Sequence, residues 1–162
     1  MSLFGATHIQ FVGEGLLAIF ADSNDTQSVT HGLRACRAAL GLVDSAHRMR
    51  HYLRTEYPER QLPLFSVAVA LHCGPVVLTR LDDPVTGKPN QFLPVGDAVS
   101  TAMLLQKQAL AMGWPIIASQ AVLASVQHDY QTGREAAIQL PGREAPLATG
   151  ELRRIASTGE KD

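Results

Sequence analysis

A short apolar stretch near the N-terminus constrains the fold of this chain more than any other feature. Residues 8–20, HIQFVGEGLLAIF, form two apolar runs separated by Gly13, Glu14 and Gly15. Apolar runs on both sides of a glycine-containing turn indicate a β-hairpin, because glycine accepts the positive φ that such turns need. The turn would hold the Glu14 carboxylate at the tip, where it could bind a hard cation such as Mg²⁺ or Mn²⁺. A solvated turn residue between two core strands is the simpler interpretation of Glu14.

The hydrophobic pattern of the remaining chain predicts two long helices, one short helix and several strands. The expected bounds are 8–12 and 15–21 for the hairpin, 27–56, 97–112 and 119–125 for helices, and 65–71, 76–81, 92–95, 114–118, 128–134, 136–140 and 151–156 for strands. Helices and strands alternate without a strict β-α-β order, and neighbouring strands form hairpins. This pattern predicts an α+β sandwich, a mainly antiparallel sheet with helices against one face. The charged last strand would lie at an edge of the sheet.

The ends and the buried faces of the two long helices can also be predicted. Asp25 or Thr26 would cap the first helix, and Pro58 would end it, because proline disfavours helix in the residue before it. Asp97 would cap the second helix, and Gly113 would end it. The expected buried stripes are Val29, Leu33, Cys36, Leu40 and Val43 on the first helix, and Val99, Met103 and Leu110 with Leu104 or Leu105 on the second.

Length and composition exclude several classes of protein. The 162 residues suit one domain, expected over 4–156, with 1–3 as a cloning remnant and 157–162 as a flexible tail. A net charge of −1 argues against a nucleic-acid partner. No apolar run reaches the roughly 18 residues of a membrane span, and no signal peptide is visible. Two cysteines, Cys36 and Cys73, without metal-ligand spacing indicate a reduced, cytoplasmic protein.

Three stretches in order resemble the catalytic domain of class III adenylate/guanylate cyclases. They are QFVGEGLLAIF, VALHCGPVV and VGDAVSTAMLL, against family patterns of the form K-x-x-G-D-x-x-x-A-x-F, G-I-H-x-G-P-V and G-D-x-V-N-x-A-x-R-L. The resemblance runs from about residue 8 to residue 155. It implies a ferredoxin-like βαββαβ core that pairs head-to-tail as a dimer with a second copy or with a partner cyclase-like domain.

The family cyclises a nucleoside triphosphate with two metal ions held by two aspartates. By the resemblance, the second metal aspartate falls at Glu14, which keeps the charge on a longer side chain. The first metal aspartate belongs to an F-x-D-I-x-G-F-T-like segment upstream, and this chain contains no such segment. The lysine and aspartate that read the purine fall at Gln10 and Leu93. Gln10 can still hydrogen-bond a base edge, whereas Leu93 cannot.

The groups that stabilise the transition state are also replaced. The family's asparagine falls at Ser100 and its arginine at Leu104, while Arg143 would lie where some members place a phosphate-binding lysine. The scaffold glycines are present and the chemical groups are largely missing. We therefore expect a regulatory or dimerisation module with impaired catalysis. An active cyclase whose first metal strand is missing, and a purely structural domain, are the alternatives.

Two histidine features have simpler interpretations than catalysis. His72 follows a predicted strand at a position where the family usually has histidine, so we expect it to be structural. His47 and His51 lie one helical turn apart and could chelate a metal ion, but such a pair is more often part of a solvated face.

Overall fold

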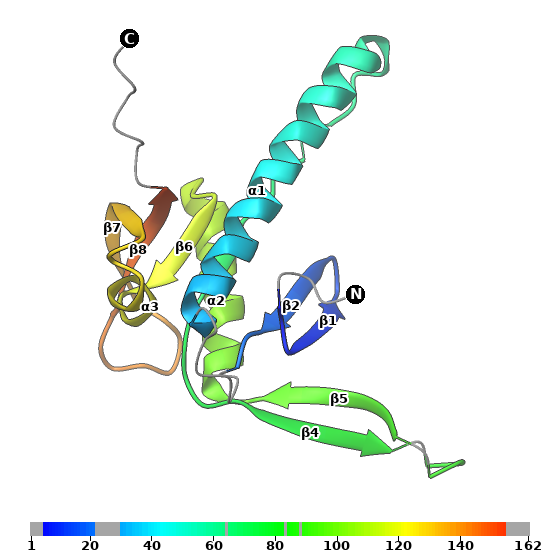
Figure 1. Cartoon of the computed structure of the whole chain (residues 1–162), viewed down its shortest axis with the longest axis vertical. Helices are drawn as coiled ribbons and strands as arrows, with labels where there is room; N and C mark the ends of the chain where they lie inside the picture. The colour runs from blue at the N-terminus through cyan, green and yellow to red at the C-terminus, as the bar shows by residue number, and fades with distance from the viewer. Residues whose placement is uncertain (1–4, 22–29, 64, 83, 88, 155–162) are drawn as a thin grey trace.

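The computed structural model describes residues 5–21, 30–63, 65–82, 84–87 and 89–154 (Figure 1). In chain order its elements are β1 (His8–Val12), β2 (Gly15–Ile19), α1 (His31–Glu56), the 3-10 helix η1 (Pro58–Arg60), β3 (Val69–Leu71), β4 (Val77–Asp82), β5 (Pro89–Val95), α2 (Asp97–Met112), β6 (Ile116–Ser119), α3 (Gln120–Ser125), β7 (Tyr130–Ile138) and β8 (Leu147–Arg154). The α+β class is confirmed. The proposed caps Asp25 and Thr26, the first turn expected for the first helix, and both chain ends lie outside the described residues.

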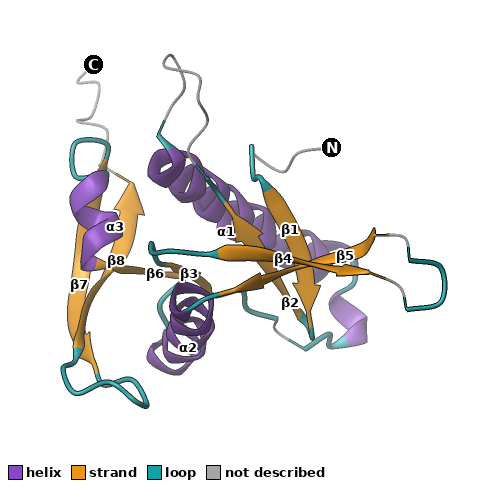
Figure 2. Ribbon diagram, turned by 90° about the horizontal axis from the view of Figure 1, so that it is seen from below, coloured by secondary structure: helices purple, strands orange, loops and turns teal. Residues whose placement is uncertain are grey.

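The main sheet has four strands in the order β3-β6-β8-β7, with β3 parallel to β6 and the other pairs antiparallel. All four residues of β6 are buried. Ile116 and Ala118 pack into the cluster beneath α1 and α3, whereas Ile117 packs into the cluster beneath α2. Helices therefore cover both faces of the sheet, as Figure 2 shows, and the expectation of helices on one face is wrong. A continuous apolar run such as β6 is typical of a strand buried on both sides.

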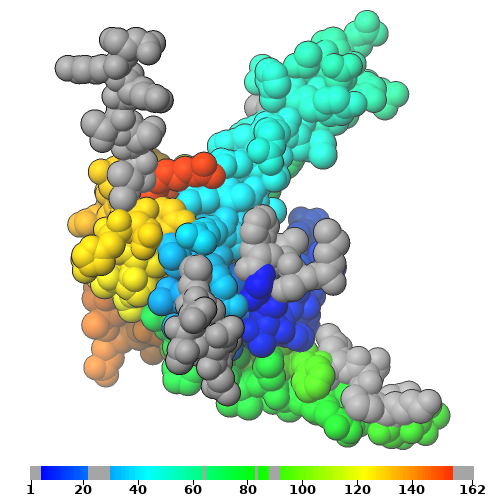
Figure 3. Space-filling model, viewed as in Figure 1, coloured from blue at the N-terminus to red at the C-terminus, as the bar shows by residue number. Residues whose placement is uncertain are grey.

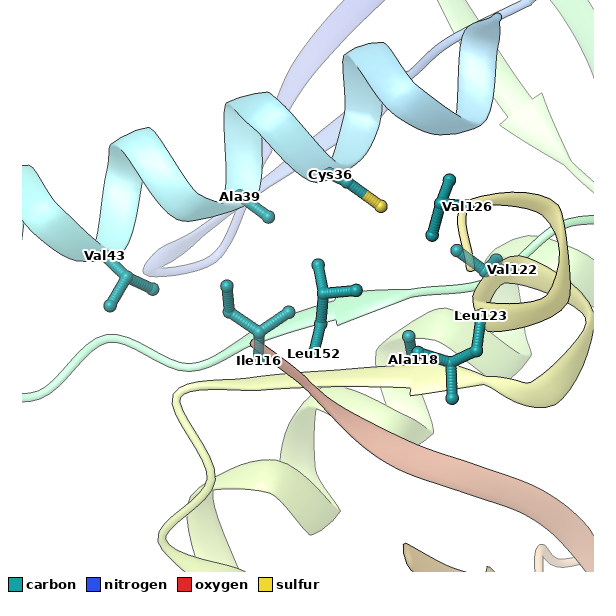
Figure 4. Close-up of a cluster of buried hydrophobic side chains, with 9 residues drawn as sticks. All are labelled: Cys36, Ala39, Val43, Ile116, Ala118, Val122, Leu123, Val126 and Leu152. Carbon is teal, nitrogen blue, oxygen red and sulfur yellow. The ribbon is translucent and has the colours of Figure 1, made fainter. Parts of the chain in front are cut away.

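One core cluster joins α1 to the sheet. Figure 4 shows Cys36, Ala39 and Val43 on α1 facing Ile116 of β6 and Leu152 of β8. Cys36 and Val43 belong to the expected α1 stripe, and its members Leu33 and Leu40 are partly buried at the margin. Val29, the first residue of that stripe, lies outside the described residues. Burial, with a smaller effect from Asp129, raises the pKa of the Cys36 thiol to about 12, so the thiol stays protonated and packs as a small apolar group.

Two hairpins stand apart from the main sheet (Figure 1). The β1–β2 pair and the β4–β5 pair each form a separate two-stranded sheet. We expected the strands over 65–81 to pair with each other in one sheet, and this is wrong, because β4 pairs with β5 while β3 pairs with β6. The chain changes direction at Gly74 and Pro75, which lie between β3 and β4. All six residues of β4 are exposed.

Arg34 of α1 forms hydrogen bonds with the segments on both sides of the β1–β2 hairpin. Its guanidinium donates hydrogen bonds to the carbonyl oxygens of Gly5 at 2.8 Å and Ala21 at 2.6 Å. These two carbonyls lie on either side of the hairpin, so one α1 side chain holds both of its ends. Thr30 caps α1, because its hydroxyl accepts a hydrogen bond from the Leu33 amide at 3.4 Å.

Several strand boundaries differ from the sequence predictions. The two strands predicted over 128–134 and 136–140 are replaced by the single strand β7 (Tyr130–Ile138), which has an irregularity between Thr132 and Glu135. The last strand, β8, begins at Leu147 and lies inside the sheet, so the predicted edge position is wrong. Its buried carboxylate, Glu151, is compensated by ion pairs to Arg134 and Arg153, which explains how a charged strand occupies an interior position.

The buried face of α2 agrees with the prediction at Leu105 and differs from it at Met103 and Leu110. The residues that face the protein interior are Ala98, Thr101, Leu105 and Ala109. Met103 is 42% exposed and Leu110 is 47% exposed. Apolar residues occur all around this helix, so periodicity alone does not select its buried face. Gly113 ends α2 in the left-handed conformation, as expected.

Among the described residues, no helix combines the length and the hydropathy required to cross a membrane.

Candidate functional site

The predicted metal ligand Glu14 lies in the exposed turn between β1 and β2. Among the described residues, no group of three or more histidine, cysteine, aspartate or glutamate side chains could hold a metal ion. A pair of catalytic cations needs more than one carboxylate to fix their positions. Within the described part of the chain, Glu14 therefore belongs to no group of three such donors, and its role as a ligand of Mg²⁺ or Mn²⁺ stays a prediction.

Gln10, the predicted base-reading residue, lies on β1 opposite Leu17. Its side-chain oxygen is buried without a hydrogen-bond partner, and so is Nε2 of His8, two residues earlier on the same face of the strand. Buried polar atoms in proteins are normally hydrogen-bonded. This face of the hairpin is therefore polar and unsatisfied in the isolated chain.

The other predicted positions lie on β5 and α2. Leu93 lies on β5 opposite Thr79 and is 38% exposed. Ser100 is exposed and Leu104 is half-buried, and because they are four residues apart they share a face of α2. Neither leucine can donate a hydrogen bond or carry a charge.

Arg143 is held at the N-terminal end of α2. Its Nη2 donates hydrogen bonds to the hydroxyl of Thr101 at 2.9 Å and to the carboxylate of Asp97. Asp97 is the first residue of α2, and the N-cap position is taken by Gly96, so the predicted capping role of Asp97 is wrong. Because the Asp97 carboxylate offsets the positive charge of Arg143, this arginine is poorly placed to stabilise a phosphate. The phosphate-binding role suggested for Arg143 stays a prediction.

His72 belongs to the same cluster. Its pKa is lowered by burial and, to a lesser degree, by the nearby positive charge of Arg143, while Asp97 acts in the opposite direction. Its Nδ1 is buried without a hydrogen-bond partner. Sequence reasoning did not find this cluster. The spacing of Asp97 and Thr101 places both on one helix face, but nothing in the sequence pattern pairs Arg143, in a distant loop, with them.

We expect the free energy of unfolding to fall as the pH is lowered from about 7.5 to about 5.5, and the His72→Gln variant to show a smaller fall. The pKa of His72 in the folded chain lies below its ordinary value of 6.5, so the unfolded chain binds this proton more readily. The contribution of His72 is therefore complete above that ordinary value and is lost as the pH falls below it. Urea unfolding followed by circular dichroism measures the effect.

The acidic residue Glu151 does not interfere with this test. Hydrogen bonding to Arg134 and Arg153 lowers the pKa of Glu151 below 4.5, so its contribution is lost only at lower pH. An equal dependence on pH in the native chain and in His72→Gln would contradict the assignment to His72.

Comparison with solved structures identifies the fold. The crystal structure of the guanylyl cyclase Cya2 matches with a TM-score of 0.69 and 16% sequence identity, covering 92% of this chain and 70% of that one. The adenylyl cyclase CyaB from P. aeruginosa matches with a TM-score of 0.63 and 16% identity over 92% of this chain and 72% of that one. A bacterial light-regulated adenylyl cyclase gives a TM-score of 0.57 and 16% identity over 92% of this chain and 39% of that one.

No family model and no curated protein sequence matches the chain. The cyclase-type α+β fold is nevertheless plain from the structural matches, and the resemblance seen in the three sequence motifs is confirmed at the level of the fold.

Proposed function

We propose that this chain is a cyclase-homology domain that does not cyclise nucleotides and acts as a regulatory and dimerisation module in a cytoplasmic cyclic-nucleotide signalling protein. The observation that carries the proposal is the combination of a cyclase fold with the loss of charged groups at the site. Gln10, Leu93 and Leu104 carry no charge, and Glu14 belongs to no group of three possible metal ligands among the described residues. Cys36 and Cys73 are unpaired, in keeping with a reducing compartment.

The expected effect on the rate of losing charge-stabilising groups supports an inactive site. Losing one group that stabilises developing charge typically slows an enzyme about 10²–10³-fold. Here Leu104 replaces a cation, and the guanidinium of Arg143 already binds Asp97. A homodimer would not restore activity, because both copies lack the same groups. A nucleoside triphosphate could still bind weakly through the Gln10 amide.

The β4–β5 ribbon supports the dimerisation role. It is a two-stranded sheet that projects from the body of the protein (Figure 3), and Val77, Phe92 and Val95 on it are 65%, 47% and 49% exposed. An isolated two-stranded hairpin is only marginally stable in water. A second copy of the chain, or a partner cyclase-like domain, would cover these apolar side chains.

One observation favours the alternative of an active cyclase. β3 is an edge strand of the main sheet, and the β1–β2 hairpin forms a sheet of its own within the described part of the chain. A further strand could pair with one of these edges and supply a second carboxylate. A purely structural domain, which binds no nucleotide, is the third candidate.

We expect no cyclic AMP or cyclic GMP from the purified chain supplied with ATP or GTP and either Mg²⁺ or Mn²⁺. Mass spectrometry detects the products, and the Glu14→Ala variant is the matched control. Product above the enzyme-free blank that disappears in Glu14→Ala would contradict the proposal and favour the active cyclase.

The assembly is tested separately by light scattering. We expect a dimer at a protein concentration of about 10–100 μM, where a Kd of about 1 μM gives mostly dimer. The Phe92→Ser variant should shift the population toward monomer, because it removes an exposed aromatic side chain from the ribbon. A monomer for the native chain would contradict the dimerisation role without bearing on catalysis.

A further inference from the structure

A small apolar slot lies between α1, the segment 65–68 that precedes β3, and the C-terminal end of α2. Its volume is about 190 Å³. The apolar walls are formed by Val43, Phe65, Val67, Ala109, Leu110 and Trp114. The candidate cyclase positions Ser100 and Arg143 lie at the opposite, N-terminal end of α2, so this slot is separate from that site.

The opening of the slot carries basic side chains. His47 and Arg50 contribute to its lining and also line an adjoining open groove of about 470 Å³, together with His51 and Arg54. Residues 47, 50, 51 and 54 follow helical spacing, so the four side chains form one face of α1. This part of α1 extends beyond the main sheet (Figure 1).

The charged side chains that line the groove favour an anionic ligand over a metal cation. His47 and His51 have the spacing of a two-histidine metal chelate, but the guanidinium groups of Arg50 and Arg54 line the same groove. A metal cation would be repelled by these two charges. Neither the slot nor the groove is lined by a described aspartate or glutamate. The groove is therefore complementary to an anion, with guanidinium and imidazole groups as hydrogen-bond donors.

The size of the slot limits the apolar part of the ligand. A buried apolar cavity of about 150 Å³ holds one benzene molecule. The slot therefore has room for a single aromatic ring or a short aliphatic chain. A ligand that fills the slot would place its polar end at the opening, beside Arg50.

We propose that the slot and the adjoining groove form a binding site for a small organic phosphate, with a ring or short chain in the slot and the phosphate against Arg50. The apolar walls contact the ring or chain of the ligand, while Arg50 and Arg54 stabilise a dianionic head. The site belongs to one chain and requires neither the dimer nor cyclase chemistry.

The test separates the two parts of the ligand with three probes. Phenyl phosphate carries both parts, inorganic phosphate only the head, and phenol only the ring. We expect phenyl phosphate to bind at least about tenfold more tightly than either of the others in NMR titrations. Amide signals of residues 46–50, 66–68 and 109–114 should move on binding. Equal affinity for phenyl phosphate and inorganic phosphate, or shifts confined to other residues, would overturn the proposal.

Two pairs of variants test the contact with the phosphate and the occupation of the slot. Arg50→Gln should weaken phenyl phosphate binding about tenfold, whereas Arg48→Gln, the same change of charge outside the groove, should leave it within about twofold. Ala46→Leu should block the slot, because Ala46 lines it, whereas Ser45→Leu next to it should not. Equal effects within either pair would count against the site. Since the two pairs are independent, a variant that fails to fold does not remove the test.

Discussion

Gly96→Ala is expected to lower the free energy of unfolding by about 3 kcal/mol or more. Gly96 precedes α2 and has φ +154°, a conformation that side-chain-bearing residues rarely adopt. A Cβ at this position would lie 2.7 Å from the carbonyl oxygen of Pro75. Because that oxygen belongs to the backbone, the clash can be relieved only by moving the loop that carries His72 to Pro75 away from α2.

A comparison with Gly13 distinguishes the free-energy cost of the steric clash from the cost of backbone strain. Gly13 also has a positive φ, +58°, but nothing lies within 4 Å of its added Cβ. Gly13→Ala should therefore cost only about 1–2 kcal/mol, the strain of a left-handed residue. Urea unfolding by circular dichroism measures both variants. A loss for Gly96→Ala no larger than that for Gly13→Ala would show that the Pro75 contact relaxes without cost.

Gly96 has a structural role at the start of α2. The glycine allows the chain around residues 74–75 to approach the start of α2, and Gly74 makes a second close approach there, with Ala98. These contacts stabilise the fold whether or not the domain binds a nucleotide.

The sequence predicted the elements whose signals are local. The β1–β2 hairpin, both long helices and the end of α2 at Gly113 are set by turn glycines, apolar periodicity and Pro58. The turn, strand or helix that carries each candidate site residue could also be predicted, because these elements have local signals. This holds for Glu14, Gln10, Leu93 and Ser100.

What the sequence did not predict depends on contacts between distant segments. The pairing of β3 with β6 instead of β4, and the interior position of β8, depend on contacts between segments that are far apart in the chain. The ion pair between Arg143 and Asp97 joins residues 46 positions apart. No periodic pattern contains such information, so the polar cluster at α2 became visible only in the structure.

Leu105→Ala is expected to lower the free energy of unfolding by about 2–5 kcal/mol, a large part of the stability of a typical domain. Leu105 is fully buried and packs with Trp114 and Ile117 between α2 and the sheet. Replacing it removes apolar contacts and leaves a cavity. Urea unfolding at low micromolar protein, where association is weak, measures the loss.

Met103→Ala is the matched control, because it shortens an apolar side chain of α2 that was expected to be buried and is exposed in the structure. Met103 is 42% exposed, so its replacement should change the stability by about 0.5 kcal/mol or less. The ratio of the two effects therefore reports which face of α2 packs against the sheet. If Met103→Ala cost as much as Leu105→Ala, α2 would be rotated relative to the sheet, and the contacts of Thr101 with Arg143 on the same buried face would have to be reassigned as well.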